Sequence, residues 1–344
     1  MALLEVRNLS TVIRRKQEYL TAVDGISFDI EAGEIIGLAG ESGCGKTLSA
    51  LSITGLLPPV AEIAGGEITL NITDNTVSHN RESSTISLNL RSLDEESLCR
   101  IRGKEISMIF QEPRQSLNPL LRIGAQISET LELHGAADKK TARAAALDML
   151  EKLKFTEPEK IFNAYPHQLS GGMCQRVMIA IAAICRPRLL IADEPSSALD
   201  TAIQEQLLTL LGQINRDFGT AILFISHDLS VVRRFCRRFL VMYAGKIVEE
   251  GPAQTLFSAS AHPYTQGLIG AIPGRQQRGK ALANIPGKAP SIEEHSPGCP
   301  FAPRCPRTQE QCRRSFPPQT ELAAGGAASA GHIVRCFVPE TSHD

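Results

Sequence analysis

The sequence lacks an excess of charge of either sign. Its 36 lysine and arginine residues nearly balance 37 aspartate and glutamate residues, which leaves a formal net charge of −1 at pH 7. Proteins that bind nucleic acid or an anionic membrane through their overall charge carry a strongly basic surface. The near-zero net charge therefore indicates neither kind of partner, and we expect no nucleic acid among the partners of this protein.

The sequence also lacks a long apolar run. The longest one near the middle, residues 178–185, is far shorter than the roughly 20 residues that span a bilayer. Near the N-terminus, Glu5 lies where a secretory segment has its apolar core, and the alternation of residues 1–7 favours an edge strand. We expect a cytosolic protein whose contacts with membranes are made through other chains.

Disulfide bonds are rare in a reducing cytosol, so we do not expect the nine cysteines to form them. Five are scattered singly, and we interpret them as small packing residues: Cys44, Cys99, Cys174, Cys185 and Cys236. The other four crowd the last fifth of the chain: Cys299, Cys305, Cys312 and Cys336. Their spacing is wider than that of most zinc knuckles, but four thiolates still make a soft tetrahedral site for iron–sulfur or zinc.

Residues 40–47, GESGCGKT, fit the phosphate-binding pattern GxxxxGK[ST] between an apolar strand and a helix. Glycines let the backbone turn so that successive N–H groups point at phosphate oxygens. Lys46 would neutralise the β- and γ-phosphates, and Thr47 would offer its hydroxyl to Mg²⁺. The predicted nucleotide-binding residues of this loop are Gly40, Glu41, Ser42, Gly43, Cys44, Gly45, Lys46 and Thr47.

An apolar run over residues 188–194 ends in two acids, Asp193 and Glu194. Buried carboxylates are costly without a cation, and Mg²⁺ held through Asp193 would supply one. Glu194 is placed to polarise an attacking water. In isolation the same pattern also fits an ordinary strand followed by an acidic helix cap.

Ser170, Gly171 and Gly172 open a helix shortly before this acidic strand. Helix N-termini favour negative charge, so these residues predict a second anion-binding site. As a bare string, Ser-Gly-Gly is also common in turns and caps.

Strand-like and helix-like segments alternate through the first 250 residues, which predicts an α/β core with a largely parallel sheet. Residues 71–104 turn polar, and we interpret them as a surface insertion without evident chemistry. From about residue 117 to 186 the pattern is helical, with an amphipathic stretch over 141–150. After Gly251 the chain reads as a separate, loop-rich module that includes an Ala/Gly run over 323–328.

These motifs, in this order, resemble the ATP-binding subunits of ABC transporters over about residues 1–270. The matching segments are Walker A (40–47), the Q-loop Gln111, the signature loop (169–175, with Met173 and Cys174 before Gln175), Walker B (189–194), the D-loop (197–200) and the switch histidine His227. The resemblance implies an α/β fold, a P-loop NTPase ABC cassette over residues 1–258. Its parts would be a mainly parallel core sheet, an antiparallel β-subdomain and a helical subdomain inserted at about 112–186.

The resemblance also implies an active ATPase and assigns roles to its residues. Glu194 would be the catalytic base, and Lys46 and His227 would hold the phosphates of ATP. The residues around Mg²⁺ would be Thr47, Gln111 and Asp193. Family members pair head to tail, so Ser170 would serve the partner's nucleotide. Gly171, Gly172 and Asp200 would also be nucleotide-binding residues. Tyr19 is a candidate for the aromatic ring that stacks on adenine, and a strand-edge tyrosine is the alternative.

Residues 111–119, QEPRQSLNP, narrow the resemblance to oligopeptide/dipeptide importer ATPases, and residues 262–265 and 298–306 agree with it. Residues 259–344 would be that subfamily's Cys-rich C-terminal extension. The implied function is to energise uptake of di- and oligopeptides, with nickel chelates, opines, glutathione or antimicrobial peptides as alternative substrates. A soluble ABC ATPase and a redox- or iron-sensing regulator are rival hypotheses from other classes.

The resemblance further implies partners and a location. They are a second ABC ATPase, in a heterodimer or a homodimer, two transmembrane permeases and an extracytoplasmic substrate-binding protein. The chain would be peripheral, at the cytoplasmic face of the bacterial inner membrane. Some members carry a [4Fe–4S] cluster on such a tail, which would be held by Cys299, Cys305, Cys312 and Cys336. Zinc and four unliganded thiols are the alternatives.

Overall fold

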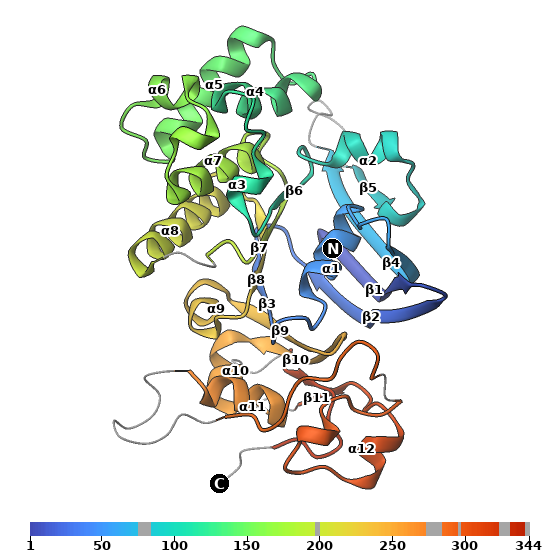
Figure 1. Ribbon diagram of the computed structural model, residues 1–344. Helices are drawn as coiled ribbons and strands as arrows, with labels where there is room; N and C mark the ends of the chain where they lie inside the picture. Colours follow the sequence, from blue (N-terminus) through green and yellow to red (C-terminus); the bar gives the residue numbers. More distant parts are fainter. Residues whose placement is uncertain (75–83, 197–199, 273–283, 295–296, 323–330, 341–344) are drawn as a thin grey trace. The chain divides into compact units, whose positions relative to one another are not determined.

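The computed structural model describes residues 1–74, 84–196, 200–272, 284–294, 297–322 and 331–340 (Figure 1). The chain divides into two compact units. The first unit comprises Met1–Leu3, Ile30–Glu34 and Ser92–Leu223, and the second comprises Leu4–Asp29, Ile35–Arg91 and Phe224–Asp344.

The second unit contains an antiparallel sheet with the strand order β2-β1-β4-β5. Its strands are β1 (Leu4–Arg15), β2 (Glu18–Ile30), β4 (Ala61–Asp74) and β5 (Ser84–Asn89). β1 lies between β2 and β4, so the prediction of an edge strand at the N-terminus is wrong. Leu4, Val6 and Leu9 are fully buried, because a central strand of a twisted sheet packs its apolar residues against the core.

The polar segment 71–104, of which the structure describes residues 71–74 and 84–104, contains regular elements. β5 pairs with the end of β4 from Thr69 opposite Asn89 to Asp74 opposite Ser84. A short 3₁₀ turn, η1 (Leu90–Ser92), and the helix α2 (Glu95–Ile101) follow in the chain. These elements lie largely at the surface, as predicted, and the polar composition did not reveal them because a strand with one face toward solvent needs only alternate apolar residues, which Ser and Thr can separate.

A second sheet in this unit carries the phosphate loop. β3 (Ile35–Ala39) runs parallel to β9 (Arg238–Tyr243), and β10 (Lys246–Pro252) runs antiparallel to β9. Residues from the C-terminal region extend the sheet, since β12 (Ile333–Val334) pairs with β10 and β11 (Thr320–Glu321) pairs with β12. The helical elements of this unit are α1 (Lys46–Thr54), α9 (Leu229–Phe235), α10 (Ala253–Ala259), α11 (Pro263–Gly270), η3 (Ala302–Arg304) and α12 (Glu310–Arg314).

The first unit joins two parallel strands to a group of helices. β6 (Ile106–Ile109) pairs with β7 (Leu189–Asp193), and β8 (Ala221–Ser226) crosses the boundary between the units in the chain. The predicted helical region is confirmed; its elements are α3 (Pro113–Ser116), α4 (Ile123–Leu133), α5 (Lys139–Lys152), α6 (Pro158–Asn163), η2 (Pro166–Gln168) and α7 (Gly171–Ala183). The long helix α8 (Thr201–Phe218) follows β7.

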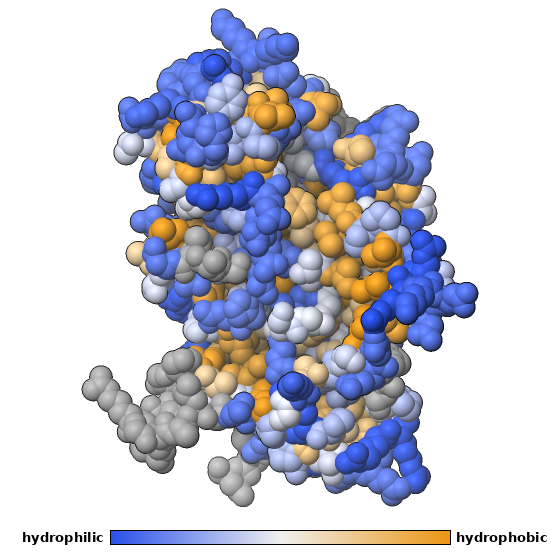
Figure 2. Space-filling model, viewed as in Figure 1, coloured by the Kyte–Doolittle hydropathy of each residue, from blue (hydrophilic) through white to orange (hydrophobic). Residues whose placement is uncertain are grey.

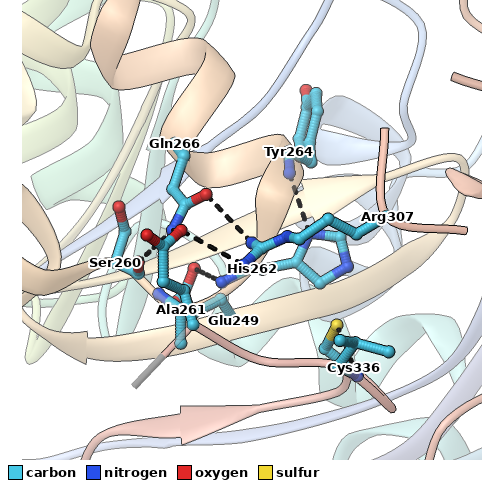
Figure 3. A network of polar contacts seen from close by, with 10 residues as sticks. Glu249, Ser260, Ala261, His262, Tyr264, Gln266, Arg307 and Cys336 are labelled. Atoms are coloured by element: carbon cyan, nitrogen blue, oxygen red, sulfur yellow. Dashed lines mark hydrogen bonds and ion pairs between the residues drawn. The ribbon is translucent and has the colours of Figure 1, made fainter. Parts of the chain in front are cut away.

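A buried polar network fastens the C-terminal region to β10 (Figure 3). The carboxylate of Glu249 accepts hydrogen bonds from the backbone N–H groups of Ala261 at 2.6 Å and His262 at 3.1 Å. His332 lies with its Nε2 2.8 Å from the same carboxylate. A buried carboxylate must be fully hydrogen-bonded to be tolerated, so these contacts fix both segments on the strand.

Nearer the surface, the same network continues through side chains of the C-terminal region. Arg307 contacts Glu340 at 3.1 Å and Gln266 at 3.0 Å, and Gln266 also donates to Glu340 at 2.6 Å. Figure 3 shows Gln266 and Arg307 beside His262. Glu340 is thus tied to α11 through Gln266.

The buried imidazole of His262 predicts a pH dependence of stability. Burial lowers the pKa of His262 from 6.5 to about 4. Between these two pH values His262 is mostly protonated in the unfolded chain and mostly neutral in the folded chain. Stability is therefore present above pH 6.5 and is lost as the pH falls toward 4. We expect this residue to reduce the free energy of unfolding by about 2 kcal/mol between pH 7 and pH 5.

Urea unfolding of wild type and His262→Asn at the two pH values measures this contribution. Asparagine keeps an acceptor for the N–H of Tyr264, which His262 Nδ1 accepts at 3.1 Å, but does not titrate. The variant should lose about 2 kcal/mol less than wild type on acidification. Equal losses in the two proteins would contradict the assignment.

Candidate functional site

The phosphate loop, residues 40–47, connects β3 to α1 in the second unit, as the sequence predicts. Gly43 and Gly45 have φ angles of +80° and +106°, which side chains other than glycine rarely adopt. A β-carbon at Gly45 would come within 2.7 Å of the carbonyl oxygen of Ala22. The loop therefore needs its glycines both for its turn and for its fit against β2.

The side chain of Lys46 lies inside this loop. It is only 5% exposed, and its Nζ donates to the carbonyl oxygens of Gly40 at 3.0 Å and Glu41 at 3.1 Å. The ammonium thus lies where a phosphate cradled by the loop would bring its negative charge. Thr47 is exposed in the first turn of α1, where its hydroxyl can serve as a hard oxygen ligand for Mg²⁺.

Three of the predicted residues gather in the first unit at the carboxyl ends of β6 and β7. Because Ile109 lies opposite Ala192 in the parallel pair, the residues that follow both strands emerge side by side. Gln111 Nε2 lies 3.5 Å from Glu194 Oε2. Asp193 is 1% exposed, and Glu194 is half-buried with a φ of +46°, a costly backbone conformation for this residue type.

The signature residues open α7 as predicted. Ser170 is the N-cap, and its Oγ accepts a hydrogen bond from the backbone N–H of Met173 at 3.3 Å. Ser170 and Gly171 are exposed, whereas Gln175 is 3% exposed and belongs to the core. The exposed end of α7 therefore presents a hydroxyl and backbone N–H groups, which suit an anion.

The remaining predicted residues lie at the ends of other elements. Asp200 caps α8 by accepting from the N–H of Ile203 at 2.9 Å, whereas residues 197–199 of the predicted D-loop lie outside the described residues. His227 is exposed directly after β8. Tyr19 is 57% exposed on β2.

The four late cysteines influence one another and therefore lie near one another. Burial raises the pKa of the Cys299 thiol to about 11, and Cys336, Cys305 and Cys312 add to this effect. The backbone N–H of Cys299 donates to the carbonyl oxygen of Cys312 at 2.7 Å. Within the described ranges, no three His, Cys, Asp or Glu side chains are placed as they would be around a metal ion. The donor chemistry thus suits a soft metal, whereas the side-chain placement is not that of a formed site.

The singly scattered cysteines behave as packing residues with one exception. Cys44, Cys174 and Cys236 are buried, and Cys185 is half-buried. Cys99 is exposed on α2, so the packing interpretation is wrong for this residue.

The C-terminal region contacts the phosphate loop, which the sequence did not predict. Arg304 in η3 forms an ion pair with Glu41, with Nη1 2.8 Å from Oε2. The hydroxyl of Tyr264 in α11 accepts a hydrogen bond from the backbone N–H of Glu41 at 2.9 Å. Glu41 and Arg304 are 263 residues apart, and no local pattern in the sequence indicates that they meet.

The glycine-rich loop around Lys46, between a parallel strand and a helix, defines a P-loop nucleotide-binding protein. Comparison with known families then gives two matches. Residues 23–197 match the family described as ABC transporter. Residues 248–312 match the oligopeptide/dipeptide transporter C-terminal region, and this second match includes Cys299, Cys305 and Cys312.

Individual proteins agree with these families. The chain is 45% identical to the oligopeptide transport ATP-binding protein AppD of Bacillus subtilis, covering 98% of this chain and 97% of AppD. It is 42% identical to OppD of Escherichia coli, covering 98% of this chain and 94% of OppD. The dimeric post-hydrolysis structure of the ATP-binding cassette MJ0796 with ADP and Pi aligns with a TM-score of 0.60 and 27% identity, covering 73% of this chain and 98% of that one.

The chain belongs to the ABC transporter family of ATP-binding proteins, and it is an ATPase of that family. Its fold is the P-loop cassette with mixed α/β sheets that the motifs predicted. Over the part of the chain that the structure describes, no helix has the length and apolar character of a membrane span.

Proposed function

We propose that this protein is the ATP-hydrolysing subunit of an importer that takes up di- and oligopeptides through partner permeases. The observation that carries the proposal is the match of residues 248–312 to the oligopeptide/dipeptide transporter C-terminal region. Full-length similarity to AppD and OppD, which are named as oligopeptide transport ATP-binding proteins, supports it. The chain would work at the cytoplasmic face of the bacterial inner membrane as a peripheral subunit.

Within the nucleotide site, we assign the residues by the chemistry that each can perform. Lys46 and the backbone N–H groups of residues 40–47 would bind the phosphates, and His227 would hold the γ-phosphate. Thr47, Asp193 and Gln111 offer the oxygen ligands that suit Mg²⁺, which neutralises phosphate charge when bound. Glu194 would accept a proton from the attacking water, and its contact with Gln111 would orient the carboxylate.

We further propose that the site is completed by a second ABC ATPase. Ser170 and Gly171 are exposed at the start of α7, where their polar groups are available to a nucleotide on another subunit. Asp200, at the start of α8, would lie at the same interface. The partner could be a related chain or a second copy, and separate tagging of the two subunits in a co-purification distinguishes a heterodimer from a homodimer.

The helical region after Gln111, at about residues 112–186, would dock the cytoplasmic loops of the permeases. Leu120 and Leu133 are 83% and 77% exposed in this segment, which is unusual for large apolar side chains. Figure 2 shows hydrophobic residues at the surface around α4, among an otherwise mostly hydrophilic face of this subdomain. Such residues are available to be covered by a partner.

Reconstitution of the complete transporter tests the function. With the two permeases, the second ATPase and the substrate-binding protein in liposomes, ATP should drive uptake of labelled di- or oligopeptides. Nickel chelates, opines, glutathione and antimicrobial peptides are assayed in the same system. Uptake of one of these and not of peptides would assign a different substrate, and ATP hydrolysis by the complete transporter without uptake of any of them would contradict an importer.

For the C-terminal region, we propose that Cys299, Cys305, Cys312 and Cys336 hold a [4Fe–4S] cluster, with zinc as the alternative. The four cysteines lie near one another, and the segment has few core-forming residues, so a bound cluster would stabilise its fold. A ligating thiol must lose its proton, so the metal has to offset the burial that raises the pKa of Cys299.

We expect protein purified without oxygen to be brown, with a broad visible absorbance that is lost in Cys299→Ser. Stoichiometric zinc in a colourless protein would contradict the cluster. Comparing the ATPase and uptake rates of the same variant separates a structural from a controlling role, because unchanged uptake would exclude control by this region.

A further inference from the structure

We propose that Arg304 is a positioning residue for ATP binding, which acts by neutralising Glu41 in the phosphate loop. The inference rests on the proposed role of residues 40–47 in holding the phosphates of ATP. A carboxylate within such a loop repels the charge of the nucleotide, unless a cation offsets it. The C-terminal region supplies that cation from a part of the chain that carries none of the nucleotide motifs.

The ion pair has the geometry of a specific contact. Arg304 Nη1 lies 2.8 Å from Glu41 Oε2, and Nη2 lies 3.2 Å from Oε1, so both branches of the guanidinium bind the carboxylate. The side chain of Arg304 is 8% exposed and that of Glu41 is 26% exposed. Bidentate pairs that are shielded from water are stronger and more directional than ordinary surface pairs.

Arg304 is itself held in place by its surroundings. Its Nε donates to the carbonyl oxygen of Pro286 at 2.8 Å, and Nη1 also donates to the hydroxyl of Tyr243 at 3.2 Å. Its guanidinium lies 5.8 Å from the ring centre of Tyr243 and 6.0 Å from that of Phe301. The cation is therefore oriented by the C-terminal region and β9, and does not depend on Glu41 for its position.

The backbone of Glu41 is fixed by the same region. Its N–H donates to the hydroxyl of Tyr264 at 2.9 Å, and Tyr264 is fully buried. The ring of Tyr264 packs 4.5 Å from that of Tyr243 and 5.4 Å from that of Phe301, measured between centres. Tyr264 and Arg304 thus hold both the main chain and the side chain of one phosphate-loop residue.

Glu41, which Tyr264 and Arg304 hold, also contacts the predicted phosphate-binding residue Lys46. Its carbonyl oxygen accepts a hydrogen bond from Lys46 Nζ at 3.1 Å. Without Arg304, the carboxylate of Glu41 would keep its charge beside the loop and would either repel the phosphates or compete for Lys46. In both cases ATP binding becomes weaker.

Equilibrium ATP binding to the full-length chain, measured by displacement of a fluorescent nucleotide without hydrolysis, tests the charge argument. Arg304→Ala should raise the Kd for ATP by about five- to twentyfold. Combining it with Glu41→Gln should restore binding to within about threefold of wild type, since the unpaired charge is gone. Arg304→Lys keeps the positive charge but cannot form the bidentate contact, so its Kd for ATP should lie between those of wild type and Arg304→Ala.

Arg307→Ala is the matched control. Arg307 forms an ion pair in the same region, with Glu340 at 3.1 Å, and its side-chain hydrogen bonds go to Glu340 and Gln266 rather than to Glu41. Its Kd for ATP should equal that of wild type. A purely structural role for Arg304 would leave the double variant as weak as Arg304→Ala, and this result would overturn the proposal.

A second measurement rests first on the wild-type protein. Coupling between two sites is reciprocal, so ATP bound to the loop should slow hydrogen exchange of the backbone amides around residues 299–306 in wild type. The protection should be smaller in the double variant Arg304→Ala/Glu41→Gln. Wild type that binds ATP but shows no protection would contradict the coupling, whereas wild type that binds no ATP would instead contradict the proposed function.

Discussion

Glu194→Gln is expected to lower the rate of ATP hydrolysis by about 100-fold or more, which is the range for loss of a general base. ATP binding should stay within about twofold of wild type, because glutamine preserves the size of the side chain and removes only the proton acceptor. The half-buried side chain already contacts Gln111, 3.5 Å away, so the amide can keep this neighbour.

Phosphate release by the assembled transporter and nucleotide binding to the chain measure the two effects separately. Glu205→Gln is a suitable control because Glu205 is exposed on α8, close in sequence to the site but outside it. The control should hydrolyse ATP at the wild-type rate. Hydrolysis by Glu194→Gln at more than about a tenth of the wild-type rate would show that another group is the base.

Lys46→Ala should abolish hydrolysis by a different route, through loss of ATP binding. The ammonium lies inside the loop, 3.0 Å from the carbonyl oxygen of Gly40, and its charge-assisted contacts to phosphate would be worth about 1.5–3 kcal/mol. We therefore expect the Kd for ATP to rise by about 10- to 100-fold.

Titration with a fluorescent nucleotide measures this Kd, and thermal unfolding without nucleotide shows whether the fold is intact. Lys140→Ala, at an exposed position on α5 in the other unit, removes the same charge outside the predicted loop and should bind ATP normally. If Lys46→Ala bound ATP as tightly as wild type, residues 40–47 would not be the phosphate site. Lys46→Ala should lose both ATP binding and hydrolysis, whereas Glu194→Gln should lose hydrolysis only. Comparing the two variants therefore distinguishes catalysis from binding.

Much of the nucleotide site could be predicted because its motifs are local. The strand before Gly40, the helix from Lys46, and the acids at the end of β7 all lie where the pattern of apolar and polar residues indicated. Short-range geometry decides such features, since a glycine-rich turn between a buried strand and a helix has few alternatives.

Pairing in the sheets was harder to predict. The N-terminal strand was expected at an edge and lies inside its sheet, and the polar segment 71–104 contains a strand and a helix. Alternating sequences look alike in edge and central strands, because the difference depends on which strands lie on either side. That information comes from distant residues and is absent from the local pattern.

By itself, the sequence determined that this protein has a P-loop cassette with the residues of an ABC ATPase and a cysteine-bearing C-terminal region. Only the tertiary structure decided that this region reaches the phosphate loop, through Arg304 and Tyr264 on Glu41. It also brought Gln111 to Glu194 and the four late cysteines near one another. The physical reason is the same in each case: motifs follow from the conformations of neighbouring residues, whereas contacts between distant residues exist only once strands have paired and the core has closed.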